Sequence, residues 1–241
     1  MLVQAAINGP RARAAHPALP VTPAEQAVAA VESVAAGAGA IHLHVRGADG
    51  RESLAAGDVA LALRAIRAAA PGVPVGVSTG AWIIPDPDRR FATVAAWTVL
   101  PDYVSVNFHE DGAAALADSF LGRGVGVEAG LSTARAAELF ATSGLAERCL
   151  RILLEPGERD IEAALATVGA VEKVLNGTRV KLRRLLHGTD GTAWPLIDAA
   201  AARGYDTRVG FEDTLALPDG ARAPSNAALV AAACRRVVQR P

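Results

Sequence analysis

The amino-acid sequence predicts a single-domain (β/α)8 barrel, the TIM-barrel class of α/β fold, over residues 1–241. Short apolar runs alternate with longer, alanine-rich amphipathic runs, with no linker or internal repeat between them. This alternation gives eight strand–helix units, and the chain length is close to the roughly 250 residues typical of such a barrel. Strands separated by helices pair in parallel through crossover connections. An open doubly wound sheet is the alternative, but the turn after the first strand, Asn8–Arg11, lacks the GxGxxG pattern typical of that fold.

The predicted strands are apolar runs of four to six residues. The seventh differs from the others, because residues 179–184 carry more charge than is usual in a barrel strand. In chain order the strands are Val3–Ile7, Ala40–Val45, Pro74–Thr79, Tyr103–Phe108, Val125–Glu128, Cys149–Leu154, Leu182–His187 and Thr207–Glu212.

Amphipathic runs between these strands predict the helices. The first has the clearest start, because Thr22 can cap it, Pro23 suits its first position and Glu25 completes a capping box. Gly37 and Gly39 end it before the second strand. In chain order the helices are expected near residues 23–36, 56–69, 86–98, 112–122, 132–143, 159–175, 192–203 and 224–238.

The composition excludes several classes of protein. Apolar residues make up 51% of the chain and charged residues 20%, which is enough to build a core and too apolar for a disordered chain. Aromatic residues make up only 4%, whereas alanine supplies 54 residues, which indicates closely packed helices. The formal net charge of −1 argues against a nucleic-acid or anionic-membrane partner.

The sequence also predicts a cytoplasmic location. No run reaches the ~18 apolar residues of a transmembrane helix. Residues 1–10 lack the charged start and apolar run of a secretory signal. Cys149 and Cys234 form no CxxC pair, as expected for two incidental thiols in a reducing compartment.

Polar and ionisable residues gather where the predicted strands end. Catalytic groups of a (β/α)8 barrel lie at the C-terminal ends of its strands and in the loops that follow, so this pattern predicts an active site at that rim. The strand ends are Ile7-Asn8-Gly9, His42-Leu43-His44, Ser78-Thr79-Gly80, Ser105-Val106-Asn107, Glu128-Ala129-Gly130, Leu154-Glu155, His187-Gly188 and Glu212-Asp213.

Two histidines on the second strand predict a metal site. His42 and His44 are two residues apart, so both side chains project from the same face of the strand. Strands two and eight of a closed barrel both flank strand one, which brings Glu212 within reach of the pair. Two histidines and one carboxylate leave a zinc ion an open position, as in catalytic sites. The alternatives are hydrogen-bonded or exposed histidines, and an ion pair of Glu212 with Arg208 or Arg46.

Asp213 is the candidate general base, because a carboxylate beside a metal can remove a proton next to a bound carbonyl. Arg208 could hold Asp213 or bind an anionic part of the substrate. The alternative is that Asp213 only caps the following loop. A Schiff-base aldolase is disfavoured, since the only lysines, Lys173 and Lys181, lie on a helix and before the seventh strand.

Further rim residues are candidate substrate contacts, although the serine, threonine and asparagine side chains could instead satisfy loop backbone. Arg11, past the first strand, could bind a negative group or could be a solvated loop residue. Asn8 and His187 are additional candidates because they face the same rim, and Trp82 could line the pocket or pack. The main substrate-binding candidates are Ser78, Thr79, Gly80, Ser105 and Asn107.

Seven segments of the chain, in order from the first strand to the last helix, resemble those of a known family. They are Ala6–Gly9, His16–Pro23, Ile41–Arg46, Val77–Gly80, Ser105–Phe108, Arg208–Asp213 and Ala223–Asn226. The IHLHVR and RVGFED segments are specific as a pair. On these residues the chain resembles the β-keto acid cleavage enzymes, whose type member cleaves 3-keto-5-aminohexanoate.

The resemblance implies a (β/α)8 enzyme with a divalent metal, usually zinc, held by His42, His44 and Glu212. It implies condensation of a β-keto acid with acetyl-CoA, which gives acetoacetate and the CoA ester of the remaining acyl fragment. Asp213, assisted by Arg208 and Ser78, would serve in proton transfer. The resemblance also implies a homo-oligomer, a dimer or a tetramer. The substrate contacts that it implies are Ser78, Thr79, Gly80, Ser105 and Asn107.

The chain departs from the family in three places. Arg11 stands where the type enzyme has an acidic residue that meets the substrate's amino group, so a neutral or carboxylated keto acid is expected. Ser105 replaces a threonine, and residues 187–191 lack the family's Gly-rich AGxGR-like run. Two alternatives stay open: a metal-dependent aldolase or isomerase that needs no CoA, and a metal-binding barrel for storage or sensing. Asp213 and Ser78 favour catalysis, since storage needs no base.

Overall fold

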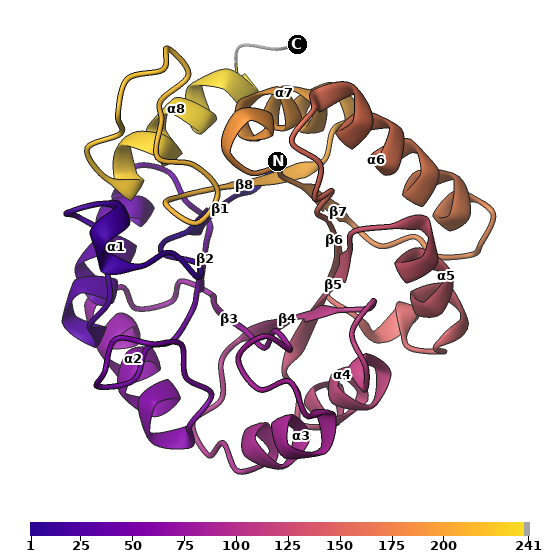
Figure 1. Ribbon diagram of the computed structural model, residues 1–241, viewed down its shortest axis with the longest axis horizontal. Coiled ribbons are helices and arrows are strands. Elements are labelled where there is room, and N and C mark those ends of the chain that lie inside the picture. The colour runs from indigo at the N-terminus through magenta and orange to yellow at the C-terminus, as the bar shows by residue number, and fades with distance from the viewer. Residues whose placement is uncertain (239–241) are drawn as a thin grey trace.

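Eight parallel strands close into a barrel in the computed structural model, which describes residues 1–238 (Figure 1). Each strand pairs with the next in the chain, and β8 pairs with β1, so the predicted (β/α)8 fold is confirmed and the open sheet is excluded. Residues 239–241 of the expected domain lie outside the described part. The strands are β1 Val3–Ala6, β2 Ala40–Leu43, β3 Val75–Ser78, β4 Tyr103–Asn107, β5 Gly126–Leu131, β6 Arg151–Leu154, β7 Arg184–Leu186 and β8 Asp206–Val209.

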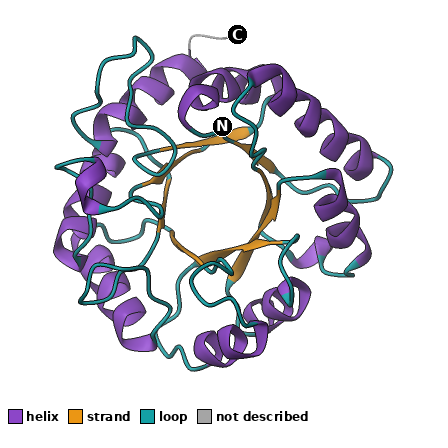
Figure 2. Ribbon diagram, in the orientation of Figure 1, coloured by secondary structure: helices purple, strands orange, loops and turns teal. Residues whose placement is uncertain are grey.

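Helices form a ring outside the strands (Figure 2). The capping box predicted at the first helix is present, with Thr22 and Glu25 each accepting from the other's backbone N–H. No helix among residues 1–238 is long and apolar enough to cross a membrane. The helices are α1 Pro23–Ala35, α2 Ala56–Ala69, α3 Pro87–Ala95, α4 Ala113–Gly122, α5 Ala134–Thr142, α6 Ile161–Asn176, α7 Ala193–Arg203 and α8 Asn226–Val238, with single 3-10 turns at η1 Arg13–Ala15, η2 Ala146–Arg148 and η3 Asp190–Thr192.

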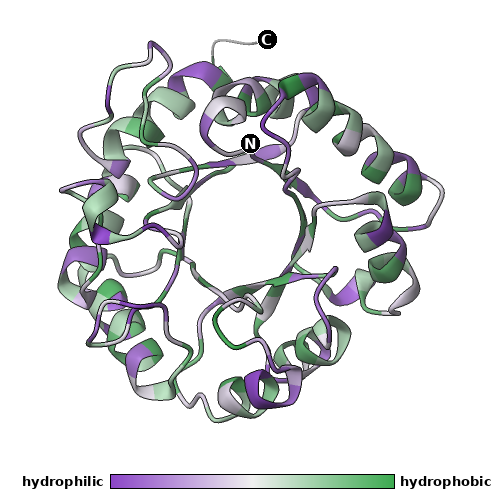
Figure 3. Cartoon of the chain, in the orientation of Figure 1, coloured by the Kyte–Doolittle hydropathy of each residue, from purple (hydrophilic) through white to green (hydrophobic). Residues whose placement is uncertain are grey.

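The two faces of each strand have different chemistry. Outward residues such as Ile41, Leu43 and Val77 belong to the apolar core between the sheet and the helices. Each helix carries both hydrophobic and hydrophilic residues (Figure 3). Buried apolar residues of the helices belong to the same core. The inward face is polar: Gln4 on β1 donates to Tyr103 on β4 and to Glu128 on β5, strands that are not neighbours of β1, so these bonds cross the barrel interior.

Every strand except β6 ends one to three residues from its predicted end, and the differences at β5, β7 and β8 bear on the site. β5 continues to Leu131, because its ladder with β6 extends to the pair Leu131 and Leu154. The prediction that Glu128 lies at the rim is therefore wrong; it lies in the body of the strand. β7 has only three residues, and the charged segment before it is outside the ladder. β8 ends at Val209, because the N–H groups of Asp213 and Thr214 both donate to the Gly210 carbonyl and form a turn.

Candidate active site

The three predicted metal ligands lie together at the mouth of the barrel. His42 is on β2, His44 follows that strand, and Glu212 lies in the turn after β8. The distance from His42 Nε2 to Glu212 Oε2 is 3.5 Å, and that from His44 Nε2 to Glu212 Oε1 is 3.4 Å. One ligand atom from each residue lies within 4.8 Å of the other two.

The loop after β1 positions these ligands. The Asn8 amide donates to the His44 carbonyl at 2.8 Å and accepts from the His44 N–H at 2.9 Å, so Asn8 fixes the backbone rather than facing a substrate. Gly9 has φ +59°, and a Cβ there would lie 2.4 Å from Glu212 Cγ. A side chain at position 9 would therefore push Glu212 away from the histidines.

The donor set fits a divalent metal such as zinc. Ligands about 2.0–2.2 Å from a tetrahedral ion lie roughly 3.3–3.6 Å apart. Each histidine Nε2 lies at such a distance from one oxygen of Glu212, that of His42 from Oε2 and that of His44 from Oε1. Glu212 Oε2 is buried and has no hydrogen-bond partner among the described residues. Glu212 Oε1 also accepts from Arg208 at 2.9 Å, so the ion pair considered as an alternative coexists with the ligand cluster.

The electrostatics of the site favour a neutral His42 and an ionised Glu212. Burial lowers the pKa of His42 to about 3, which leaves its nitrogen free to bind a cation. Burial alone would raise the pKa of Glu212, but Arg208, His44 and His42 outweigh it and hold the pKa well below the ordinary value. Burial alone would lower the pKa of His44, yet the charge and hydrogen bonds of Glu212 and Glu52 raise it to about 9.

Arg208 and Asp213 form a buried pair beside the ligands. The Arg208 guanidinium donates to Asp213 Oδ1 at 2.7 Å, and the Asp213 side chain is fully buried. Asp213 Oδ2 has no hydrogen-bond partner among the described residues. The carboxylate therefore binds Arg208 and does not cap the following loop. Burial opposes the positive charge of Arg208, but Asp213 and Glu212 outweigh it and raise the pKa of Arg208.

His187 joins the same cluster from the end of β7. Its Nδ1 lies 3.3 Å from Asp213 Oδ1, and its Nε2 lies 3.8 Å from Glu155 Oε2. Burial would lower the pKa of His187, as would Arg208, but Asp213 and Glu155 outweigh them and raise it. The sequence predicts only that Glu155 lies at a strand end. Its position opposite His187 depends on the register of β6 with β7.

The predicted substrate contacts divide into two groups. Ser78 and Ser105 are paired across β3 and β4 and share the inward face. The other three have partners within the protein: the Thr79 hydroxyl donates to the Ser105 carbonyl at 2.7 Å, and the Asn107 amide donates to Glu110 at 2.9 Å. Gly80 lies directly against the ring of Trp82.

Arg11 is held at the rim by an acid from a distant loop. It donates to Asp190 Oδ1 at 2.6 Å and to the Glu212 carbonyl at 3.3 Å. Its charge therefore has a partner, and its expected contact with a substrate stays a prediction.

Glu52 is a residue of the site that sequence reasoning missed. Its Oε1 lies 2.5 Å from Nδ1 of the predicted ligand His44, and it also accepts from the Trp82 indole N–H. The available signal was Asp49-Gly50, a dipeptide typical of tight hairpin turns, which brings the chain back beside His44.

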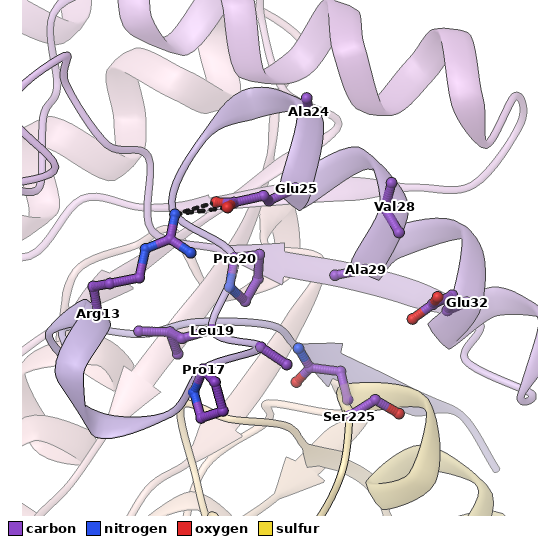
Figure 4. Close-up of a pocket in the computed structure, with 12 residues that line it drawn as sticks. Arg13, Pro17, Leu19, Pro20, Ala24, Glu25, Val28, Ala29, Glu32 and Ser225 are labelled. Carbon is purple, nitrogen blue, oxygen red and sulfur yellow. Dashed lines mark hydrogen bonds and ion pairs between the residues drawn. The ribbon is translucent and has the colours of Figure 1, made fainter.

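Cavities adjoin the mouth on two sides. One of about 720 Å³ is lined by residues that include Arg46, Glu52 and Trp82. Another of about 810 Å³ is lined by residues that include Asp190 and Trp194. The pocket in Figure 4, about 460 Å³, lies elsewhere, between the η1 loop, α1 and the start of α8, where Arg13 and Glu25 form an ion pair. It contains none of the predicted site residues.

Comparisons with known proteins agree with this fold. The family model described as beta-keto acid cleavage enzyme matches residues 1–240. The structure is similar to ObcA without ligand (TM-score 0.72, 19% identity, covering 93% of this chain and 62% of that one). ObcA in a ternary complex with a C4-CoA adduct and oxalate gives a TM-score of 0.73 at 19% identity, covering 93% of this chain. This chain spans 64% of the length of ObcA in that complex. The 3-hexulose-6-phosphate synthase from Salmonella typhimurium shares the fold more distantly (TM-score 0.57, 16% identity, covering 100% of both chains).

Proposed function

The chain belongs to the beta-keto acid cleavage enzyme family, and from this premise we propose that it condenses a β-keto acid with acetyl-CoA. The products are acetoacetate and the CoA ester of the remaining acyl fragment. The observation that carries the proposal is the position of the Arg208–Asp213 pair directly beside the donor set of His42, His44 and Glu212. Storage of a metal would need the donors but not the adjacent pair.

His42, His44 and Glu212 would hold a divalent ion, preferably zinc. When bound, such an ion supplies Lewis-acid polarisation of a carbonyl oxygen. The three residues come from two segments that Asn8 and Gly9 keep in place, so the ligands are arranged before any substrate enters.

Asp213 would accept and return the proton at the carbon beside the keto group. Arg208 occupies Oδ1, which leaves Oδ2 as the acceptor atom. A positioned carboxylate of this kind is a general base of the sort that enzymes use for such transfers. Ser78, on the inward face of β3, would donate its hydroxyl to a substrate oxygen.

The co-substrate is inferred from the family and from room at the mouth. The complexes of ObcA with oxaloacetate and with a C4-CoA adduct support a small keto acid and a CoA ester as the class of substrate. The cavities of about 720 and 810 Å³ beside the mouth offer space for the part of acetyl-CoA that does not react. Location in the cytoplasm and assembly into a homodimer or homotetramer stay predictions.

The experiment is a screen of β-keto acids with acetyl-CoA and zinc-loaded protein, in which acetoacetate and the new acyl-CoA are both measured. We expect one acetoacetate per acyl-CoA, and no turnover in His42→Ala protein, which loses a metal ligand. Turnover of a keto or hydroxy acid without CoA would contradict the proposal and support the aldolase or isomerase alternative. Bound metal without any turnover across the screen would support storage.

A further inference from the structure

The metal ligand His44 lies at one end of a short chain of side chains that leads to the protein surface. Its Nδ1 lies 2.5 Å from Glu52 Oε1. The indole N–H of Trp82 lies 3.1 Å from both oxygens of the same carboxylate. The Trp82 ring also stacks on the His44 ring, with centroids 5.9 Å apart and an angle of 23° between the planes.

Glu52 is placed by a tight hairpin that begins directly after His44. Position 46 bridges position 52, Gly47 and Arg51 are joined by a backbone hydrogen bond of 2.8 Å, and the Ser53 N–H donates to the Val45 carbonyl at 2.9 Å. The Glu52 side chain is only 13% exposed. Backbone pairing in the hairpin therefore holds the Glu52 carboxylate beside His44, and the side chain is not a flexible surface group.

Trp82 comes from a different segment, the loop after β3. The ring rests on Gly80, where a Cβ would lie 2.1 Å from ring atoms, so only glycine leaves room for this arrangement. Trp82 is 51% exposed. Although the ring is half-exposed, its indole N–H has a partner in the Glu52 carboxylate and its face lies against His44.

We propose that Glu52 and Trp82 are positioning residues for the metal ligand His44. Glu52 accepts the Nδ1 proton of His44 and so directs Nε2 toward the ion, while Trp82 fixes the carboxylate and covers the imidazole from solvent. Carboxylates that accept from a metal-bound histidine fix its tautomer and ring orientation in this way. The inference rests on the metal site of the proposed function and adds to it two residues outside the ligand set.

The test is the zinc dissociation constant, measured by competition with a chromophoric chelator, so that it does not depend on turnover. We expect Glu52→Gln to weaken zinc binding by about 10–100-fold, because a neutral amide oxygen is a weaker acceptor for the His44 Nδ1 proton than a carboxylate and brings no negative charge to the imidazole. Trp82→Phe keeps the stacked ring but loses the N–H, and we expect a smaller loss of about 3–10-fold. Glu138→Gln, an exposed change on α5, is the matched control and should leave the constant unchanged.

The outcomes separate this inference from the proposed function. If wild-type protein binds zinc, and the dissociation constants of Glu52→Gln and Trp82→Phe are both within twofold of the wild-type value, the positioning role is overturned and the metal site stands. Wild-type protein that binds no zinc would overturn both. If Glu52→Gln fails to fold, Trp82→Phe still tests the proposal, because its half-exposed ring can be replaced without opening the core. Unchanged zinc binding in Trp82→Phe would overturn the role of Trp82.

Discussion

Two layers of polar and charged side chains lie inside the barrel, and they differ in charge balance. The lower layer, near the N-terminal ends of the strands, is defined by Gln4, Tyr103, Glu128, Arg151 and Asp206. The upper layer, at the mouth, is defined by His42, His44, Glu155, His187, Arg208, Glu212 and Asp213.

Each carboxylate of the lower layer has a guanidinium beside it. Arg151 lies 2.6 Å from Glu128, and Arg183 reaches Asp206 at 2.7 Å from below. The upper layer instead has three carboxylates around the single arginine Arg208. Burial raises the pKa of Glu128, whereas the pKa of Glu212 is held low by its cationic and imidazole neighbours.

The difference teaches which buried charges indicate function. The charges of a balanced buried pair are compensated within the protein, so the pair needs no ligand. An excess of carboxylate at the open end, with histidine nitrogens among it, would be balanced by a bound cation. The presence of buried charge alone would indicate a functional site in both layers.

Asp213→Asn should have the largest effect, and only on catalysis. The amide keeps the shape of the carboxylate but cannot accept a proton, so turnover should fall by about 10²–10⁴-fold. Zinc content, measured by elemental analysis, should stay at one ion per chain. Activity within tenfold of wild type would remove the role of Asp213 as base.

Arg151→Met should break the lower layer and lower stability. It leaves the Glu128 carboxylate buried without its guanidinium, which should cost about 3–5 kcal/mol in the free energy of unfolding. Urea unfolding measures the loss. The double variant with Glu128→Met should recover most of it, since a buried pair can be replaced by apolar residues. A double variant as unstable as Arg151→Met would show that packing, and not charge, determines the loss.

Zinc should stabilise the protein through the upper layer. At a free zinc concentration 100 times the dissociation constant, binding to the native state alone adds about 2.7 kcal/mol to the free energy of unfolding. A higher melting temperature shows this increment. Glu212→Gln should remove most of this increment and Arg151→Met should retain it. An equal increment in Glu212→Gln would place the ion elsewhere.

His187→Asn should give the smallest effect, a fall in kcat of about tenfold with little change in KM, because the side chain supports Asp213 without touching the ion. His187→Gln, which is long enough to reach Asp213, should recover part of the rate. Steady-state kinetics with the keto acid found in the screen provide the measurement. A selective rise in KM would instead make His187 a substrate contact.

The sequence predicts the faces of the strands better than their depth in the barrel. Strand periodicity correctly placed His42 with His44, and the order of strands brought Glu212 to them across strand one. The same reasoning put Glu128 at the rim, because alternation says which way a side chain points but not how far along the axis its strand has shifted against its neighbours.

Contacts between distant loops could not be predicted from the sequence for a related reason. Arg11 meets Asp190, a partner 179 positions away, and Glu155 meets His187 through the pairing of two strands. Neither contact leaves a periodic pattern in the sequence. Glu52 was closer to being predictable, since a turn signal precedes it, but a turn alone does not say which carboxylate will face the histidine.

The pairing of β8 with β1 has a consequence for how the protein matures. The expected ligands come from residues 42, 44 and 212, so they meet only after the last strand has closed against the first. Contacts of such long sequence separation form late, since the entropy of closing a long loop must be overcome first. A partly synthesised or misfolded chain would hold two imidazoles without the carboxylate, and would release an ion that the closed barrel would retain. Retention of metal would thus distinguish finished molecules from folding intermediates.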